Sequence, residues 1–260
     1  MYTSRFAPLA AALALTTTLV TGCKKDSDPF TPQSGAFAVE LENAVGTLPL
    51  NLSTDTYTTA AGDRFTVSTF KYFLSNFTLT KADGSTYVVP SSYFLVNQAN
   101  GDSQHLDLKD VPAGDYTGLT FTVGVDSART KAGNFTGALA ADPGMFWDWS
   151  KEFKNVVLEG TSLQSPTGGL VFHIAGFKVS NGANNTIRTV SPAFPANTKL
   201  LVRADHTPEI HMHVDVLGMF GAPNPVRFAT TYNTMGGPAS ARVANNLAAG
   251  MFAIEHIHAN

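Results

Sequence analysis

One stretch of the sequence decides the expected fold, because apolar and polar residues alternate strictly over its eight positions: Glu209-Ile210-His211-Met212-His213-Val214-Asp215-Val216. Such alternation is typical of a half-buried β-strand, in which successive side chains point to opposite faces. The four apolar side chains therefore face a core, and the four polar ones share the other face, about 6.6 Å apart along the strand. Two imidazoles so placed, His211 and His213, are close enough to bind one metal ion.

Five of the seven histidines fall after residue 205. The C-terminal end carries a second pair with the same spacing, His256-Ile257-His258, and His173 lies within the apolar run 170–177. The same-face neighbours of His173 in a strand are Val171 and Ala175, so we expect its ring to be at least partly buried. A buried imidazole needs a hydrogen-bond partner or a metal ion.

Simpler explanations remain open for each histidine taken alone, namely a solvated strand face, a backbone hydrogen bond for His173 and a disordered C-terminal end. The coincidence of two His-x-His pairs with a semi-buried histidine favours a metal site instead. Imidazole nitrogens without thiolates suit Cu(II), Zn(II) or Ni(II), and copper heads the affinity order. The predicted ligands are a subset of the following residues: His173, His211, His213, His256 and His258.

The N-terminus has the pattern of an export signal. Arg5 precedes an apolar run over 6–20, which gives way to Thr21-Gly22-Cys23. These residues resemble the lipobox of bacterial lipoproteins, in which the cysteine thiol takes a diacylglycerol and becomes the first residue of the mature chain. The resemblance implies a signal peptide over 1–22 and lipidation of Cys23, which is the only cysteine. An ordinary secretory signal followed by an accidental cysteine is the alternative.

The stretch that follows is polar and contains prolines, so we interpret 23–35 as the lipidated cysteine and a flexible tether. The folded domain is expected to cover 36–260. The lysines and aspartates after the cysteine resemble the tails of Bacteroidetes surface lipoproteins. That resemblance implies an outer-membrane lipoprotein that faces either the periplasm or the cell surface.

Composition excludes one class of partner. Charged residues make up 14% of the chain, the formal net charge is -3, and no basic run is present. Nucleic-acid binding requires clustered lysine and arginine opposite the phosphates, so we do not expect it. The low charge is common on exported β-proteins, and the apolar content is sufficient for one sizeable core.

The remaining pattern is strand after strand, which predicts an all-β fold, an antiparallel β-sandwich or barrel. A turn is expected at 111–115 and a long loop at 126–144. One short C-terminal helix is expected after Pro238, because Val243, Leu247 and Met251 recur every four residues. The predicted strands, apart from 209–216, cover these ranges: 36–42, 65–80, 86–89, 93–96, 105–108, 116–125, 153–158, 170–177, 186–190 and 199–204.

Several motifs, in order along nearly the whole mature chain, resemble the MbnP-like copper-binding family. The resemblance implies an exported copper protein in which a partner di-haem enzyme oxidises a tryptophan to kynurenine, which then joins histidines at the copper ion. Trp147 or Trp149 occupies the matching position; an aromatic plug that anchors the loop is the alternative. The motifs that carry the resemblance, together with the C-terminal His-x-His, are 70–76 (FKYFLSN), 110–114 (DVPAG), 124–129 (GVDSAR), 144–149 (GMFWDW) and 172–177 (FHIAGF).

A copper-binding protein for acquisition, storage or delivery is thus the predicted function. A glycan-binding or adhesin-like lipoprotein, with Trp147 and Trp149 as a stacking platform, is the alternative. The sequence has no Gly-x-Ser-x-Gly, no phosphate-binding Gly-Lys-Ser/Thr loop and no His-Glu-x-x-His. We therefore do not expect hydrolase, nucleotide-binding or zinc-protease activity, and only copper redox catalysis stays open.

Overall fold

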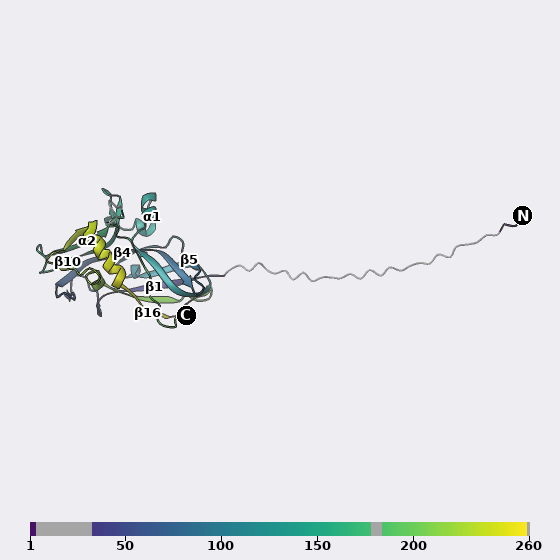
Figure 1. Ribbon diagram of the computed structural model, residues 1–260, viewed down its shortest axis with the longest axis horizontal. Helices are drawn as coiled ribbons and strands as arrows, with labels where there is room; N and C mark the ends of the chain where they lie inside the picture. The colour runs from purple at the N-terminus through teal and green to yellow at the C-terminus, as the bar shows by residue number, and fades with distance from the viewer. Residues whose placement is uncertain (4–32, 178–183, 259–260) are drawn as a thin grey trace. The chain divides into compact units, whose positions relative to one another are not determined.

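A computed structural model describes residues 1–3, 33–177 and 184–258 of the protein (Figure 1). The chain divides into two units, Met1–Thr31 and Pro32–Asn260. Cys23 and nearly all of the predicted signal peptide lie outside the described residues, as does the tether up to residue 32. No helix in the described part of the chain combines the length and the apolar character needed to cross a membrane.

Five strands of the second unit form the smaller sheet. β1 (Ser34–Val45) runs through its middle and pairs with β14 (Glu209–Asp215) on one edge. On its other edge β1 pairs with β7 (His105–Pro112) and then with β2 (Leu48–Pro49), while β16 (Phe252–His258) pairs with β14. The stretch 209–215 is thus a strand, as its alternation predicts, and it has a hydrogen-bonded neighbour on each side.

The larger sheet is built around a long central strand, β4 (Arg64–Lys81), and follows the order β12-β8-β4-β10-β11-β15. Several short strands pair with β4, β8 or β10 outside this path. The other strands of this sheet are β3 (Tyr57–Thr58), β5 (Thr86–Val88), β6 (Tyr93–Asn97), β8 (Gly114–Val123), β9 (Phe146–Trp147), β10 (Glu152–Thr161), β11 (Gly169–Ala175), β12 (Arg188–Val190), β13 (Leu200–Val202) and β15 (Asn233–Met235).

The apolar faces of the two sheets share one core. Phe252 of β16 contacts Tyr72 of β4 and Phe121 of β8, with ring centroids 6.2 and 5.3 Å apart. Ile210, Met212 and Val214 of β14 belong to the same buried cluster. The apolar half of the alternating stretch therefore points into this core, and its polar half faces the other way.

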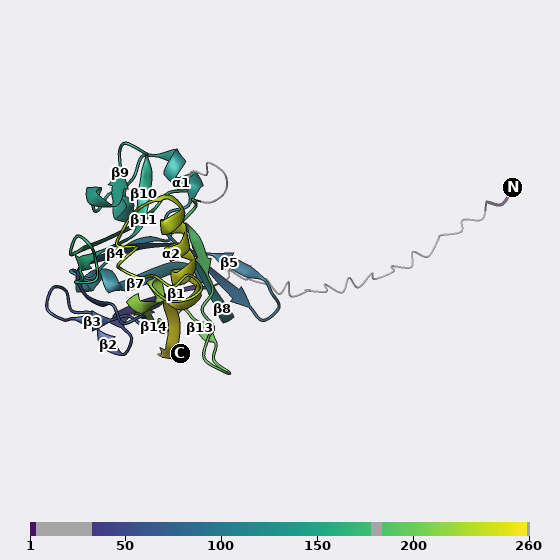
Figure 2. The ribbon, with the colours of Figure 1, turned by 60° about the vertical axis from the view of Figure 1, so that its left-hand side comes forward.

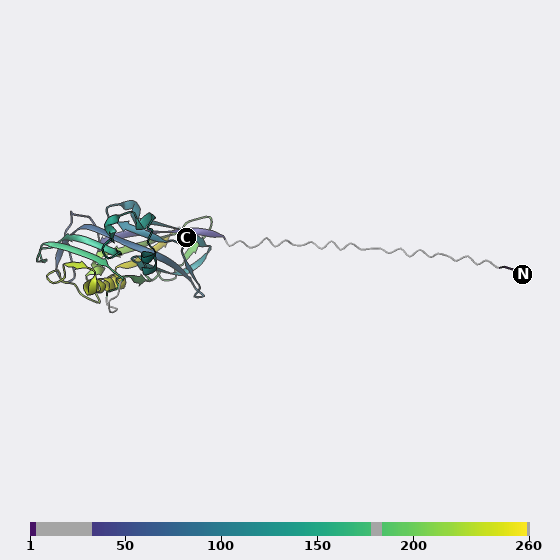
Figure 3. The ribbon, with the colours of Figure 1, turned by 90° about the horizontal axis from the view of Figure 1, so that it is seen from above.

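Helix α2 (Gly237–Gly250) lies against β11 and β15 and leads directly into β16 (Figure 2). Pro238 occupies its first turn, where a missing N–H costs nothing. The predicted apolar stripe, Val243, Leu247 and Met251, is buried in the core. Seen from above in Figure 3, the helix lies along one side of the strands.

The all-β class and the C-terminal helix are confirmed, whereas three local predictions are wrong. The sheets are not purely antiparallel, because the pairs β1–β14 and β11–β15 run parallel. The expected loop 126–144 contains a six-residue helix, α1 (Ser127–Ala132), which is too short to show an apolar period and begins at a cap where the Asp126 carboxylate accepts from Arg129 N–H at 2.8 Å. The expected turn 111–115 shrinks to Ala113, because β7 ends at Pro112 and β8 begins at Gly114.

Four remaining short helical turns are of the 3-10 type among the described residues. They include η4 (Val216–Met219), which ends the alternating stretch. The others are η1 (Gly101–Gln104), and two consecutive turns before β9, η2 (Gly137–Leu139) and η3 (Pro143–Met145). The first strand also begins earlier than the expected domain start at 36, since Ser34 and Gly35 already pair with β7.

Candidate metal centre

The register of β14 and β16 brings the two histidine pairs together. The strands are antiparallel, with His211 opposite His256 and Glu209 opposite His258. Directly opposite residues on antiparallel strands point to the same face, with Cβ atoms about 5 Å apart. Three imidazoles and one carboxylate therefore share a small area of the outer face of the smaller sheet.

A β-bulge in β16 makes this arrangement possible. Met212 pairs with Ile254 whereas His211 pairs with His256, so Glu255 is one extra residue in β16. Strict alternation from the inward-facing Ile254 would turn His256 and His258 toward the core. The extra residue resets the alternation, and both histidines emerge on the outer face, where they are exposed.

The imidazole nitrogens of the three histidines converge. Ring nitrogens of His211, His256 and His258 all lie within 4.8 Å of one another, and Nε2 of His211 is 2.5 Å from Nε2 of His258. The rings of His211 and His256 stack, with centroids 4.3 Å apart and an angle of 14° between the planes. A metal ion with bonds of about 2.0 Å holds two such nitrogens roughly 3 Å apart, so small ring rotations are sufficient to bind one ion.

Carboxylates lie beside these nitrogens. Oε2 of Glu40 on β1 is 3.1 Å from Nε2 of His211. The two carboxylate oxygens of Glu209 lie 4.0 Å from Nε2 of His211 and 3.8 Å from Nε2 of His258. Glu209 also faces Nδ1 of His105 on β7, at 3.5 Å. The carboxylates of Glu40 on β1 and Glu209 on β14 thus lie beside Nε2 of His211.

The other polar residues on the outer face of β14, His213 and Asp215, have partners outside the three-histidine group. His213 lies on the same face as His211, but Nδ1 of its ring faces Oε1 of Glu255 at 3.8 Å, and His213 is not part of the three-histidine group. Asp215 accepts hydrogen bonds from the backbone N–H groups of Leu217 and Gly46, at 2.9 and 2.8 Å. The carboxylate of Asp215 therefore has a structural role at the start of η4.

His173 belongs to a different place in the molecule. It lies on β11 of the larger sheet, and the residue is buried at 8% exposure, as its apolar neighbours predict. Its partner is not the backbone: Nε2 lies 2.8 Å from Oε1 of Glu159, while Nδ1 is buried and has no hydrogen-bond partner within the described chain. In Figure 2, β9 and β11 are labelled in the upper half of this unit and β14 in the lower half.

The two tryptophans lie on the same side of the molecule as His173, and Trp147 is the one beside its ring. The ring of Trp147 lies 6.1 Å from the ring of His173 and 5.2 Å from that of Trp149, and Nζ of Lys154 lies 5.7 Å from its centroid. Trp147 is 9% exposed and Trp149 is 76% exposed. Trp147 is therefore the tryptophan within reach of a histidine, and only Trp149 offers an open ring face.

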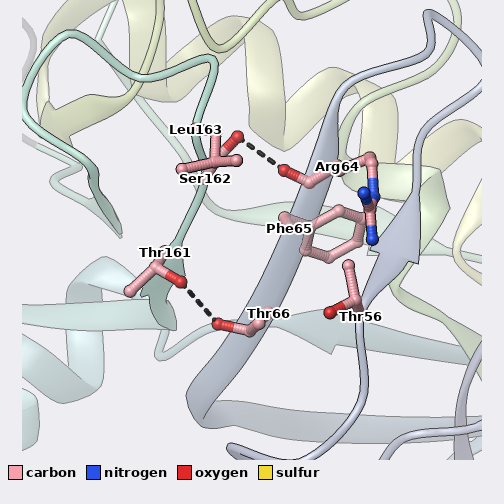
Figure 4. Close-up of a pocket in the computed structure, with 7 residues that line it drawn as sticks. All are labelled: Thr56, Arg64, Phe65, Thr66, Thr161, Ser162 and Leu163. Atoms are coloured by element: carbon pink, nitrogen blue, oxygen red, sulfur yellow. Dashed lines mark hydrogen bonds between the residues drawn. The ribbon is translucent and has the colours of Figure 1, made fainter.

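A small surface pocket elsewhere lacks metal-binding chemistry. It has a volume of about 150 Å³ and lies where β4 meets the end of β10 (Figure 4). Hydrogen bonds from the Ser162 hydroxyl to the carbonyl of Arg64 (2.6 Å) and between Thr66 and Thr161 (2.8 Å) hold its walls together. Its lining contains neither a histidine nor a carboxylate: Thr56, Arg64, Phe65, Thr66, Thr161, Ser162 and Leu163.

The sequence pattern missed two members of the outer cluster, Glu40 and His105. Glu40 lies in a predicted strand and His105 begins another. The position of Glu40 beside His211 depends on β1 pairing with β14, and that of His105 beside Glu209 depends on β1 pairing with both β7 and β14. No local signal predicts the partner of a strand so distant in the sequence. There was one local indication in the sequence. Both residues are polar and alternate with apolar neighbours, which places their side chains on the outer face of the sheet.

Comparisons with known proteins agree with this fold. The sequence model of the MbnP family matches residues 34–236. Among solved structures, the chain is similar to MbnP from Methylosinus trichosporium, with a TM-score of 0.50 and 13% sequence identity over 79% of this chain and 83% of that one. No curated protein matches the sequence. Trp147, Glu159 and His173 lie inside the matched region, whereas His256 and His258 follow its last residue.

Proposed function

The chain belongs to the MbnP family. We propose that it is an exported, lipid-anchored protein and that it binds copper through His211, His256 and His258. The observation that carries this proposal is the convergence of three imidazoles from two hydrogen-bonded strands, with ring nitrogens within 4.8 Å of one another. Neutral imidazoles are good ligands for copper, which exceeds zinc and nickel in the affinity order of divalent ions. The exposed position of the cluster suits uptake and transfer of an ion.

Copper binding by purified domain 33–260 tests the proposal. Equilibrium dialysis against Cu(II) is expected to show binding, and His211→Ala or the double change His256→Ala with His258→Ala should weaken it by at least about tenfold, since even indirect support of a metal ligand is typically worth 10–100-fold. The matched controls are His213→Ala, on the same face of the same strand, and His206→Ala, whose ring faces Asp205. Equal losses in the cluster and control variants, or none in either, would contradict the assignment.

Trp147 is proposed as the tryptophan that the partner di-haem enzyme oxidises. Its ring lies beside His173, whose Nδ1 has no hydrogen-bond partner among the described residues. In the oxidation the indole C2–C3 bond breaks, both carbons gain oxygen from dioxygen or peroxide, and hydrolysis releases C2 as formate. The indole nitrogen has no free lone pair, whereas kynurenine offers an aniline nitrogen and a carbonyl oxygen as ligands.

Peptide mass spectrometry distinguishes the two tryptophans. Protein from the native host should show net loss of one carbon and gain of one oxygen at Trp147 and an intact indole at Trp149. Recombinant protein made without the partner enzyme should retain both indoles. Two unmodified tryptophans in native protein under copper limitation would refute the oxidation while leaving the three-histidine site untouched.

A further inference from the structure

The carboxylates around His211 are not scattered surface charges, because their oxygens lie within 4.0 Å of imidazole ring nitrogens. Glu40 approaches Nε2 of His211 from β1, at 3.1 Å. Glu209 lies within 4.0 Å of ring nitrogens on three strands, those of His105, His211 and His258. The Glu209 side chain is 24% exposed and that of Glu40 is 50% exposed, so water screens Glu209 less.

The two groups of donors also overlap. Ring nitrogens of His211, His256 and His258 form one close set, and a nitrogen of His211 forms another with the carboxylate oxygens of Glu40 and Glu209. Nε2 of His211 is the atom that faces His258, Glu40 and Glu209. Because one nitrogen lone pair binds one ion, the two sets describe a single site with nitrogen and oxygen donors.

We infer that Glu40 and Glu209 make this a site for divalent copper, so that the protein binds Cu(II) in preference to Cu(I) there. This inference rests on the proposed copper function and adds the oxidation state. Two carboxylates and neutral imidazoles carry two negative charges, which a divalent ion balances and a monovalent ion does not. Carboxylate oxygen is a hard donor that suits divalent ions, whereas Cu(I) is selected by the soft sulfur of thiolates and thioethers.

Sulfur is absent from the described part of the cluster. Met212 is the nearest sulfur-bearing residue on β14, but its side chain is buried in the core on the opposite face of the strand. Cys23 is the only cysteine of the chain and lies outside the described residues. The donors that converge on Nε2 of His211 are therefore nitrogen and oxygen alone.

Charge-neutral substitutions test the inference on otherwise unchanged protein. Glu40→Gln and Glu209→Gln keep the size of the side chain and remove its charge, with Glu42→Gln as the matched control, two residues along β1 and opposite His213. Affinities for Cu(II) and for Cu(I) are measured separately, by competition with glycine and with a Cu(I)-specific chelator under anaerobic reducing conditions. Each cluster variant should bind Cu(II) about tenfold or more weakly and Cu(I) within about threefold of the unchanged protein.

The same difference is visible electrochemically. A tenfold loss of Cu(II) affinity with Cu(I) unchanged raises the one-electron midpoint potential of the bound copper by about 59 mV. Glutamine variants that bind both ions like the unchanged protein, or that lose both equally, would overturn the role of the carboxylates. Failure of the proposed copper site gives a different result in the same affinity measurements, because His211→Ala would then bind both ions as the unchanged protein does.

Discussion

Asp63 shows how a single buried charge is stabilised in this fold. Its side chain is 1% exposed, yet both carboxylate oxygens accept from the Arg227 guanidinium at 3.1 Å, and the N–H of Phe228 donates to one of them at 2.9 Å. Burial alone would raise the pKa of Asp63, but these hydrogen bonds and the charge of Arg227 hold that pKa below its ordinary value. The ionised form is therefore the one that the folded state favours.

The sign of the resulting pH dependence follows directly. A carboxyl whose pKa is lower in the folded chain than in the unfolded chain stabilises the fold above its unfolded pKa, near 3.9, and this contribution is lost as the pH falls further. Asp63→Asn should lower the free energy of unfolding by about 1–3 kcal/mol at pH 7. In urea titrations the difference from the unchanged protein should shrink below about pH 4. The exposed Asp102→Asn is the control and should stay within about 0.5 kcal/mol; a pH-independent difference for Asp63→Asn would refute the account.

Residue-level prediction of the site succeeded where it depended on local spacing. The strict alternation of 209–216 predicts that His211 faces away from the core, and the apolar neighbours of His173 predict its burial. The same reasoning named His173 among five histidines of which a subset would bind the metal, and the structure places it on β11 of the larger sheet, whereas His211 lies on β14 of the smaller one. Spacing along one strand carries no information about which strands become neighbours.

At the level of elements, the bulge in β16 accommodates one extra residue, so that His256 and His258 still reach the outer face. Glu255 is the extra residue, so its deletion leaves His256 opposite His211 and His258 opposite Glu209 in a regular ladder. We expect the deletion to keep the Cu(II) affinity within about threefold, because the donors of the site are unchanged. Dialysis of the deletion variant checks this, with His256→Ala as the comparison. A loss as large as that of His256→Ala would show that the register is not as described.

Helix α2 contributes to stability through its buried stripe. Leu247 is fully buried in the core between the two sheets, and replacing a buried leucine by alanine typically costs 2–5 kcal/mol through lost transfer energy and a residual cavity. Leu247→Ala should therefore lower the free energy of unfolding by about 2–5 kcal/mol in urea titrations. Arg242→Ala, on the exposed face of the same helix, should change it by less than about 0.5 kcal/mol. Equal effects of the two changes would contradict the packing of α2.

Prediction of the elements worked best for long periodic segments. The strands β1, β4, β8, β10 and β14 and helix α2 follow from apolar periodicity, whereas α1 spans only six residues and gives no such signal. Parallel pairing of β1 with β14 was not predicted, because the two strands are far apart in the sequence and no hairpin constrains them. The position of Glu40 beside His211 depends on that pairing and was missed for the same reason.

For the whole molecule, the lipid anchor remains a prediction that rests on residues 1–23. Cys23 follows an apolar run with small residues before it, so Cys23→Ala should prevent lipidation and leave the protein unprocessed or soluble. Fractionation of host membranes, with lipid labelling of the unchanged protein, checks the outcome. An alanine variant that still fractionates with the outer membrane like the unchanged protein would contradict an anchor at Cys23.

Copper at the junction of β14 and β16 is the central claim, and anomalous X-ray diffraction from copper-loaded crystals of the domain tests it most directly. The predicted result is an anomalous peak among the ring nitrogens of His211, His256 and His258, with a carboxylate oxygen of Glu40 or Glu209 in its coordination shell. A peak beside His173 and Trp147, with none on the outer face of β14, would contradict the account.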